Sequence, residues 1–488
     1  MTYKILTLLI LLINIVTAGD SVDKKIAALI HNYQKQPYLK HAQWSLSAIY
    51  IDDGSPIIDY QSEQSLAPAS GLKLFTSSEA LDILGEDFTC DTKLFYDGIF
   101  KSGTLNGNIY IVGGGDPTLG SDQVDGSLSL DSLMDTWVVA IQSKGISKIN
   151  GSIIADPLLF DEMTVPDNWN WIDIGNYYGA GVSALNINDN LYHLVFKPAS
   201  GPGQPAEVLR TEPEIPDLQF INHILTGKSG SGDNGYIYCA PGQFSAVLRG
   251  TVPAGESEFK IKGSIPDPPL FSAQELHRSL IGHGIAITNS PSVLKSIQDY
   301  DPDKLIHTTK SPPLKDIVYI INKRSFNLYA ETLPKLLAVN EGKTGTLENG
   351  LKIIQEWLET NNIFTEGFEM SDGCGLSRSN MITTRAMVEL LRYMKSRPVF
   401  NALYQSMGVA GDPDDIGYFS NFGKGTAIAF NARIKSGLIN NVRSHSGYVQ
   451  DRSGRWIAFS FIANNYTGRL SNINNVHEKI LIELASRK

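Results

Sequence analysis

One serine and one lysine have the spacing of a nucleophile and its base. Ser70 and Lys73 stand at the start of a stretch, GLKLFTSSEALDIL, whose apolar residues have helical spacing. Three residues are close to one helical turn, so the two side chains share a face. A neutral amine there can take the serine proton, and a helix N-terminus favours the resulting anion. The pair therefore indicates acyl transfer through a serine.

The spacing alone is weak evidence, because it recurs in the chain. It is also found at Ser21/Lys24, Ser257/Lys260 and Ser292/Lys295. Ser21 lies beside a predicted cleavage site, and Ser257 lies in a polar, loop-like region. Ser292 starts a plausible helix, so periodicity does not exclude it. Only Ser70 starts a helix directly after a strand pair and leaves room downstream for two further matching elements.

The second element is Ser325-Phe326-Asn327, in a helical stretch or at a turn between two helices. Its hydroxyl can relay a proton to a leaving amine, and its amide can bond both a lysine and a substrate carbonyl. Seen alone, the tripeptide fits a helix-capping serine and a solvated asparagine better. It indicates a catalytic role only in combination with the other two elements.

The third element is Lys435-Ser436-Gly437, on a predicted strand near the C-terminus. A cation and a hydroxyl can hold a terminal carboxylate, and the glycine lets a substrate backbone lie beside the strand edge. Similar tripeptides begin at Lys101, Lys228 and Lys343. The first two fall in a β-rich region and the third between helices, so only Lys435 begins a C-terminal hairpin.

The elements that would position these residues can be read from the pattern. Residues 43–58 predict a β-hairpin around an Asp-Asp-Gly turn. Residues 90–300 are rich in short strand-like runs and have few long helical patterns. Helical periodicity then returns, and the C-terminal part predicts three adjacent strands followed by a helix over 474–485. This order predicts one sandwich-like α/β domain that is split by an insertion.

Composition and the N-terminus restrict the compartment and the partners. The net charge of −10 argues against binding to nucleic acid or to an anionic membrane. Residues 1–18 predict a secretory signal peptide, because Lys4 precedes an apolar run that ends in Val16-Thr17-Ala18. An uncleaved anchor is disfavoured, since the run has about 12 residues where a spanning helix needs about 20. No later stretch is apolar enough to span a bilayer.

Cysteine, histidine and tryptophan give weaker signals. The three cysteines, Cys90, Cys239 and Cys374, cannot form a disulfide framework, although a single pair such as Cys90 with Cys239 stays open. The nine histidines show no paired spacing, so no metal and no cofactor is expected. Trp169 and Trp171 could stack on a glycan, but packing in the core or in a hairpin is favoured.

Together the three elements resemble the active site of penicillin-binding proteins and serine β-lactamases, with its Ser-x-x-Lys, Ser-Asp-Asn and Lys-Thr-Gly motifs. The chain is most similar to the penicillin-binding protein 4 type, the low-molecular-mass class C D-Ala-D-Ala carboxypeptidases, in which a long insertion separates the first two motifs. Longer strings resemble that family too, among them LAPASGLKLFTSSEAL, YYGAGVSALNINDN, NLYAE and DGCGLSRSN. The departures are Phe326 for a polar residue, Ser436 for threonine, and Cys374 where serine is common.

The resemblance implies a role for each matching residue. Ser70 would form the acyl-enzyme, Lys73 would be its general base, and Ser325 would relay protons. Asn327 would orient the substrate and Lys73, and a buried Lys73 amine near a second cation would have a lowered pKa. The C-terminal end of the substrate would be held by Lys435, Ser436 and Gly437. The backbone N–H groups of Ser70 and Leu438 would form the oxyanion hole.

The fold implied is an α/β (α+β) transpeptidase domain like that of penicillin-binding proteins and serine β-lactamases, an antiparallel sheet flanked by helices, with a large β-rich insertion. After the signal peptide, the expected units are a split catalytic domain and two inserted domains. Their ranges are 19–90 with 299–488 for the catalytic domain, 91–115 with 190–298 for inserted domain II, and 116–189 for inserted domain III.

The function implied is a periplasmic serine D-Ala-D-Ala carboxypeptidase and DD-endopeptidase. Its partners would be peptidoglycan peptides, with β-lactam antibiotics as covalent inhibitors, and no nucleic acid. No transmembrane anchor would remain after signal removal, and a homo-oligomer stays open. Two alternatives are kept: a β-lactamase or esterase of the same fold, and a non-catalytic wall-binding module.

Overall fold

A computed structural model of the chain describes residues 21–488. The signal peptide expected at 1–18 lies outside the described residues. None of the helices within 21–488 combines the length and the apolar character that crossing a bilayer requires. Cys90, Cys239 and Cys374 are all buried free thiols, so the disulfide that the sequence left open is not formed.

A six-stranded antiparallel sheet forms the centre of the catalytic part. Its order is β18 (Gly408–Val409), β19 (Arg433–Ile439), β20 (Val442–Gln450), β21 (Trp456–Asn464), β1 (Gln43–Tyr50) and β2 (Pro56–Tyr60). All but the first residue of β21 are buried, as expected for a near-continuous apolar run that is covered on both faces. The hairpin predicted over 43–58 and the three C-terminal strands are therefore confirmed.

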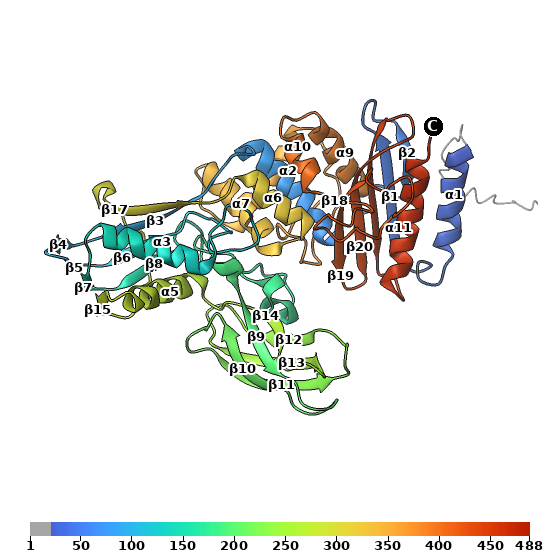
Figure 1. The fold of residues 1–488 in the computed structure, drawn as a ribbon. Helices are drawn as coiled ribbons and strands as arrows, with labels where there is room; N and C mark the ends of the chain where they lie inside the picture. The colour runs from blue at the N-terminus through green and yellow to red at the C-terminus, as the bar shows by residue number, and fades with distance from the viewer. Residues whose placement is uncertain (1–20) are drawn as a thin grey trace, which may run out of the picture.

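Helices cover both faces of this sheet (Figure 1). On one face α1 (Ser21–Gln34) packs on α11 (Leu470–Ala485), which confirms the predicted closing helix. On the other face α9 (Thr384–Lys395) lies directly against β1, β20 and β21. The remaining helices of this layer are α2 (Lys73–Leu84), α6 (Leu314–Lys323), α7 (Asn327–Asn340), α8 (Leu347–Thr360) and α10 (Phe400–Ser406). Separate apolar clusters fill the two interfaces, so the fold is the α/β arrangement expected.

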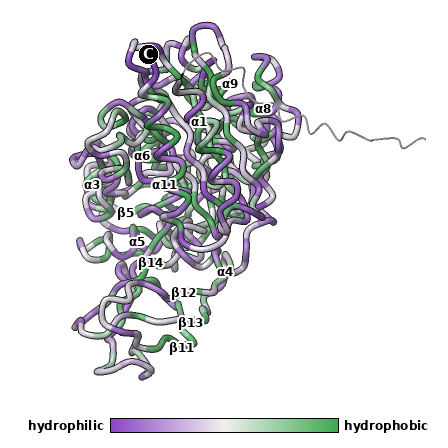
Figure 2. The backbone as a smooth tube through the Cα atoms, turned by 90° about the vertical axis from the view of Figure 1, so that its right-hand side faces the viewer, coloured by the Kyte–Doolittle hydropathy of each residue, from purple (hydrophilic) through white to green (hydrophobic). Residues whose placement is uncertain are grey.

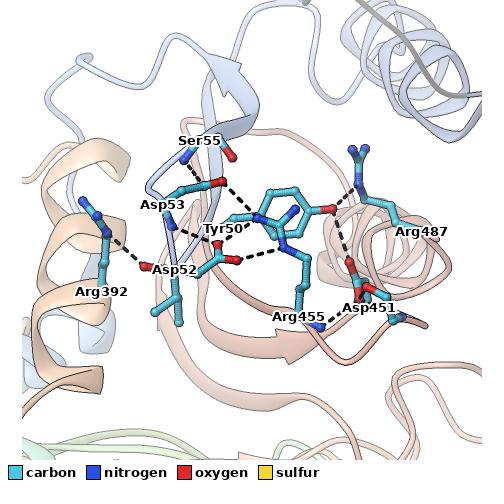
Figure 3. Close-up of polar contacts among 10 residues, drawn as sticks. Tyr50, Asp52, Asp53, Ser55, Arg392, Asp451, Arg455 and Arg487 are labelled. Carbon is cyan, nitrogen blue, oxygen red and sulfur yellow. Dashed lines mark hydrogen bonds and ion pairs between the residues drawn. The ribbon is translucent and has the colours of Figure 1, made fainter.

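A cluster of side chains ties three chain segments together at one end of the sheet (Figure 3). The Arg455 guanidinium lies 3.5 Å from the centre of the Tyr50 ring and pairs with Asp52 at 2.8 Å. The Tyr50 hydroxyl donates to Asp451 and accepts from Arg487, both at 3.2 Å. The turn after β1, the turn after β20 and the C-terminal residues are thus held to one another.

The insertion fills the chain between α2 and α6 and contains two sheets in its first unit. One sheet consists of β3 (Asp91–Tyr96), β6 (Ile109–Val112), β8 (Ile153–Asp156), β16 (Ser292–Val293) and β17 (Leu305–Lys310). The other consists of β4 (Ile99–Lys101), β5 (Thr104–Asn106), β7 (Lys148–Ile149) and β15 (Ala286–Ile287).

A second unit, the small lobe, spans residues 191–264 and projects from the rest of the molecule (Figure 2). Its strands form two three-stranded sheets, and an isolated bridge joins Gly263 of the lobe to Asn176 outside it. They are β9 (Leu191–Lys197), β10 (Glu207–Glu212), β11 (Gln219–Gly227), β12 (Asn234–Tyr238), β13 (Ser245–Pro253) and β14 (Phe259–Ser264).

These strand pairs do not follow the division of the insertion expected from the sequence. β6, which the sequence grouped with 190–298, pairs in parallel with β8 of the 116–189 segment. β17, which was placed in the catalytic domain, pairs with β3. The parallel pairs join strands that are far apart in the chain, and such long-range pairing leaves no local pattern in the sequence.

The expectation of few long helices in the insertion is wrong at two places. α3 (Leu130–Ser143) and α5 (Pro268–Gly282) each span about four turns and bury one face. Both begin at an ordinary helix signal: Ser129 accepts from the Ser132 N–H, and Asp267 accepts from the Leu270 N–H ahead of two prolines. Capping residues would have revealed these helices, whereas the Gly and Pro density around them concealed them.

Candidate active site

Ser70 lies in a single 3-10 turn, Ala69–Leu72, that runs directly into α2. The Lys73 Nζ atom is 2.9 Å from the Ser70 Oγ atom. Ala69 has φ +48°, a backbone conformation that costs about 1–2 kcal/mol for a residue with a Cβ atom. Strain of this kind persists only where the surroundings impose it, and it is common at functional sites.

Lys73 is surrounded by two further acceptors that cannot donate. Its Nζ atom lies 2.6 Å from Asn327 Oδ1 and 2.6 Å from the Cys374 carbonyl oxygen. The Asn327 amide is fixed in this orientation, because its nitrogen donates to the Tyr178 carbonyl at 2.7 Å. A neutral amine that gives its two hydrogens to these oxygens directs its lone pair at Ser70, which is the geometry of a general base.

The pKa of Lys73 is lowered, chiefly because the ammonium is fully buried and loses its hydration. Cys374, Asp372 and Glu331 act in the opposite direction and favour the charged form. The lowered pKa was expected from burial beside a second cation. Burial is the main cause, and the charged groups that shift this pKa are acidic rather than cationic.

Lys435 forms a second pair of amine and hydroxyl. Its Nζ atom is 2.9 Å from Ser325 Oγ and 2.8 Å from the Ser436 carbonyl oxygen. Burial holds its pKa well below the usual range, and the positive charges of Lys73 and Arg443 lower it further. Cation repulsion therefore acts on this lysine. Ser325 has φ +58° in the turn between α6 and α7, where the sequence placed it as one of two options.

Gly437 has a packing role that the sequence did not predict. A Cβ atom added there would overlap the Pro68 carbonyl oxygen and the Ser444 hydroxyl. Ser444 in turn donates to that same carbonyl at 2.6 Å. The glycine thus lets β19 lie against the turn that carries Ser70, and its expected role beside a substrate backbone stays a prediction.

Gly437→Ala is expected to separate the two parts of the site. The overlap should cost about 1–3 kcal/mol of stability, and the displaced serine should slow its acylation at least about 100-fold. Thermal unfolding and the rate of penicillin labelling measure the two effects. Gly282→Ala is the matched control, because nothing lies within 4 Å of a Cβ added at the end of α5. Equal behaviour of the two variants would contradict this account.

A cleft of about 920 Å³ opens between the catalytic part and the insertion. From the catalytic part it is lined by Ser70, Ser325, Asn327, Ser436 and Leu438. The insertion contributes Asn170, Asp173, Tyr177, Tyr178 and Tyr236. Lys73 and Lys435 are buried beside it and bond to its hydroxyls. All eight site residues predicted from the sequence therefore line this cleft or lie directly beside it.

A larger cleft, of about 1110 Å³, lies between β2 and α9. It is lined by Asp59, Glu63, Arg385, Glu389 and Arg392 among others, and by none of the eight residues. Arg385 pairs there with both Glu63 and Glu389. This larger cleft is thus a charged surface groove away from the chemistry.

The structure adds residues that the sequence did not assign. Asp372 accepts from the Trp169 indole at 2.8 Å and from the Gly375 and Ser377 N–H groups. Trp169 is buried in this contact, as the packing alternative predicted, whereas Trp171 is half exposed. The backbone carbonyls of Cys374 and Tyr178 carry no side-chain signal, although both stand in strings that resembled the family.

The competing motifs lie elsewhere. Ser292 begins β16 and not a helix, so that expectation is wrong. The motif that begins at Lys101 lies at the turn between β4 and β5. Those at Lys228 and Ser257 start in loops of the small lobe, and the one at Lys343 lies between α7 and α8.

Comparison with known proteins gives consistent matches over most of the chain. The model of the D-Ala-D-Ala carboxypeptidase 3 (S13) family matches residues 26–484. A D-alanyl-D-alanine carboxypeptidase of Actinomadura sp. (strain R39) is 27% identical over 445 residues, 89% of this chain and 80% of that protein. The D-alanyl-D-alanine carboxypeptidase DacB of Haemophilus influenzae is 24% identical over 436 residues, 86% of this chain and 85% of that protein.

Solved structures agree in fold. The crystal structure of penicillin binding protein 4 from Haemophilus influenzae has a TM-score of 0.81 at 22% identity, covering 95% of this chain and 99% of that one. A predatory peptidoglycan endopeptidase from Bdellovibrio bacteriovorus has a TM-score of 0.50 at 16% identity, covering 91% and 94%.

Proposed function

The chain belongs to the D-Ala-D-Ala carboxypeptidase 3 (S13) family, and we propose that its cleft hydrolyses the terminal D-Ala-D-Ala bond of peptidoglycan stem peptides. It is a serine-type carboxypeptidase. A second substrate in the proposal is the crosslink between a D-Ala and a neighbouring stem peptide. The enzyme would cut the amide bond on the carbonyl side of that D-Ala and so act as an endopeptidase. β-Lactams would acylate the same serine, and a β-lactam complex is known for the Haemophilus influenzae protein.

The first half-reaction follows from the positions of the side chains. The Ser70 oxygen attacks the carbonyl carbon of the penultimate D-Ala while its proton passes to the Lys73 amine. The developing oxyanion is held by the N–H groups of Ser70 and Leu438. The peptide C–N bond then breaks, and the leaving amine receives, through Ser325, the proton that Lys73 took, so Lys73 is neutral again. D-Ala departs and an ester on Ser70 remains.

The second half-reaction hydrolyses the ester and regenerates the free enzyme. Water loses a proton to Lys73 and attacks the ester carbon, and the Ser70 oxygen leaves with a proton. Lys435 and Ser436 hold the terminal carboxylate during the first half, with the half-buried Arg443 adding positive charge to the cleft. No cofactor enters either step.

One observation carries the proposal: Lys73 is buried between two oxygens that only accept and one serine hydroxyl. The test is release of D-alanine from a synthetic stem pentapeptide by the mature protein, against the same peptide ending in L-alanine. One equivalent should be released from the first peptide, none from the second, and none after treatment with benzylpenicillin. Rapid turnover of penicillin without peptide cleavage would instead identify a β-lactamase, and no labelling at all a binding module.

Crosslinked muropeptide dimers test the endopeptidase part of the proposal. Conversion of dimers to monomers at a rate comparable with D-alanine release would support it. Dimers that stay intact while pentapeptides are trimmed would restrict the enzyme to carboxypeptidase action.

The same proposal includes a location and a division of the chain. Export through residues 1–18 would bring the enzyme to the periplasm, where its substrate lies. The catalytic domain would consist of about 21–90 with 311–488. The insertion would consist of two units, 91–190 with 265–310 and the small lobe at 191–264, a division that the strand pairing supports.

A further inference from the structure

Glu331 is a buried carboxyl group one helical turn after Asn327 on α7. Its side chain is 1% exposed. One oxygen accepts from the Gly373 N–H at 2.8 Å, and the only other donor beside the carboxyl among the described residues is the weakly donating Cys374 thiol. A half-satisfied buried carboxyl is costly, and the reaction described above gives it no role.

Glu331 connects with Lys73 through a short loop. Gly373 binds Glu331 through its N–H and accepts from the Thr76 hydroxyl through its carbonyl at 2.7 Å. The next carbonyl, that of Cys374, accepts from Lys73. The loop is therefore held from α7 on one side and from α2 on the other, with its oxygen aimed at the amine.

We propose that Glu331 is a positioning residue for acyl transfer, which acts through Lys73 in two ways. It fixes the Cys374 carbonyl that orients the amine, and its charge determines how readily that amine gives up its proton. The inference rests on the proposed function of Ser70 and Lys73.

The charge effect has a definite sign. Burial, followed by the nearby Asp372, raises the pKa of Glu331 to about 8, whereas the Gly373 N–H, the Cys374 side chain and Lys335 act in the opposite direction. The other titratable groups that face this region are Lys73, Cys374 and Lys435. As pH rises through 8, Glu331 becomes negative and favours the ammonium form of Lys73. Ionised Glu331 thus opposes loss of the proton that makes Lys73 a base.

The test is Glu331→Gln, which keeps an acceptor for the Gly373 N–H and removes the charge. The rate constant for acylation by benzylpenicillin is measured from pH 5 to 10 by mass spectrometry of the adduct. Below pH 7 the two profiles should superpose, because Glu331 is itself neutral there. Above pH 8 the variant should be acylated roughly 3- to 10-fold faster than the wild type, because it carries no ionised Glu331 to favour the ammonium form of Lys73. Equal rates above pH 8, or slower acylation of the variant there, would overturn the proposal.

Glu79→Gln is the matched control. Glu79 is also a fully buried glutamate whose oxygens have no partner among the described residues, and it lies on α2 itself. It is not among the groups that affect Lys73. Its pH profile should superpose on that of the wild type, and an equal gain above pH 8 would show that loss of any buried carboxyl suffices.

Glu331→Asp keeps the inference testable if the glutamine variant does not fold. The shorter side chain retains the charge but cannot reach Gly373, so the maximal acylation rate should fall about tenfold, with no gain over the wild type above pH 8. Wild-type rates in that variant would overturn the positioning role. Failure of the wild type itself to form an adduct would contradict the proposed function instead, so the two failures differ.

Discussion

Ser70→Ala is expected to abolish covalent labelling by penicillin and to reduce D-alanine release by about 10⁴–10⁶-fold, because no other group can accept the acyl chain. The fold should persist. The Ser70 hydroxyl bonds Lys73, which keeps its two carbonyl partners, so the loss of stability should stay near 1 kcal/mol.

The measurement for Ser70→Ala is the intact mass after penicillin treatment, followed by peptide mapping of the wild-type adduct. Ser292→Ala is the matched control, because Ser292 and Lys295 share the same spacing on β16 and in the loop after it. That variant should label like the wild type. An adduct that maps to Ser292, or one that survives in Ser70→Ala, would remove the assignment.

Lys73→Met is expected to slow acylation by about 10²–10⁴-fold, the usual contribution of a general base. Penicillin should still bind, because the cleft and Lys435 are untouched. The methionine leaves Asn327 Oδ1 and the Cys374 carbonyl without a donor, which costs about 1–3 kcal/mol each. It also removes the desolvation of a buried ammonium, so the two changes offset each other and the protein should stay folded.

Single-turnover acylation at several penicillin concentrations separates the rate of Lys73→Met from its binding. Lys335→Met is the control, as this lysine on α7 is equally buried but bonds Asp161 and the Met163 carbonyl. It should lower the melting temperature through its broken ion pair and leave the acylation rate near that of the wild type. A wild-type rate in Lys73→Met would contradict the role of Lys73 as the base.

Local patterns predicted the catalytic part of the fold well. The alternation around residues 43–58 and the helical spacing after Ser70 correspond to β1, β2 and α2. The strand that carries Lys435 is β19, and the tripeptide at Ser325 lies at the turn between two helices. These are short-range features, and in each of them the propensity and the apolar spacing of neighbouring residues predict the same structure.

The insertion was harder because its pairing is long-range. β6 and β8 are joined in parallel across α3, and neither strand signals its partner. Part of the site could not be predicted from the sequence for a similar reason. The Tyr178 carbonyl fixes the Asn327 amide, and the Cys374 carbonyl fixes Lys73. Both are main-chain groups, and a carbonyl is present at every residue. Only the folded chain distinguishes these two from the rest.

The bond from the Asn327 amide to Tyr178 makes the insertion more than an accessory. An asparagine amide is nearly symmetric in shape, and a half-turn of its end would present hydrogens to Lys73 in place of an oxygen. The amine would then have to turn its lone pair away from Ser70. A chain shortened to its transpeptidase core would therefore lack the contact that orients this amide and would be inactive even when folded. The outer surface of the insertion is free to vary in sequence, whereas the loop at Tyr178 is constrained.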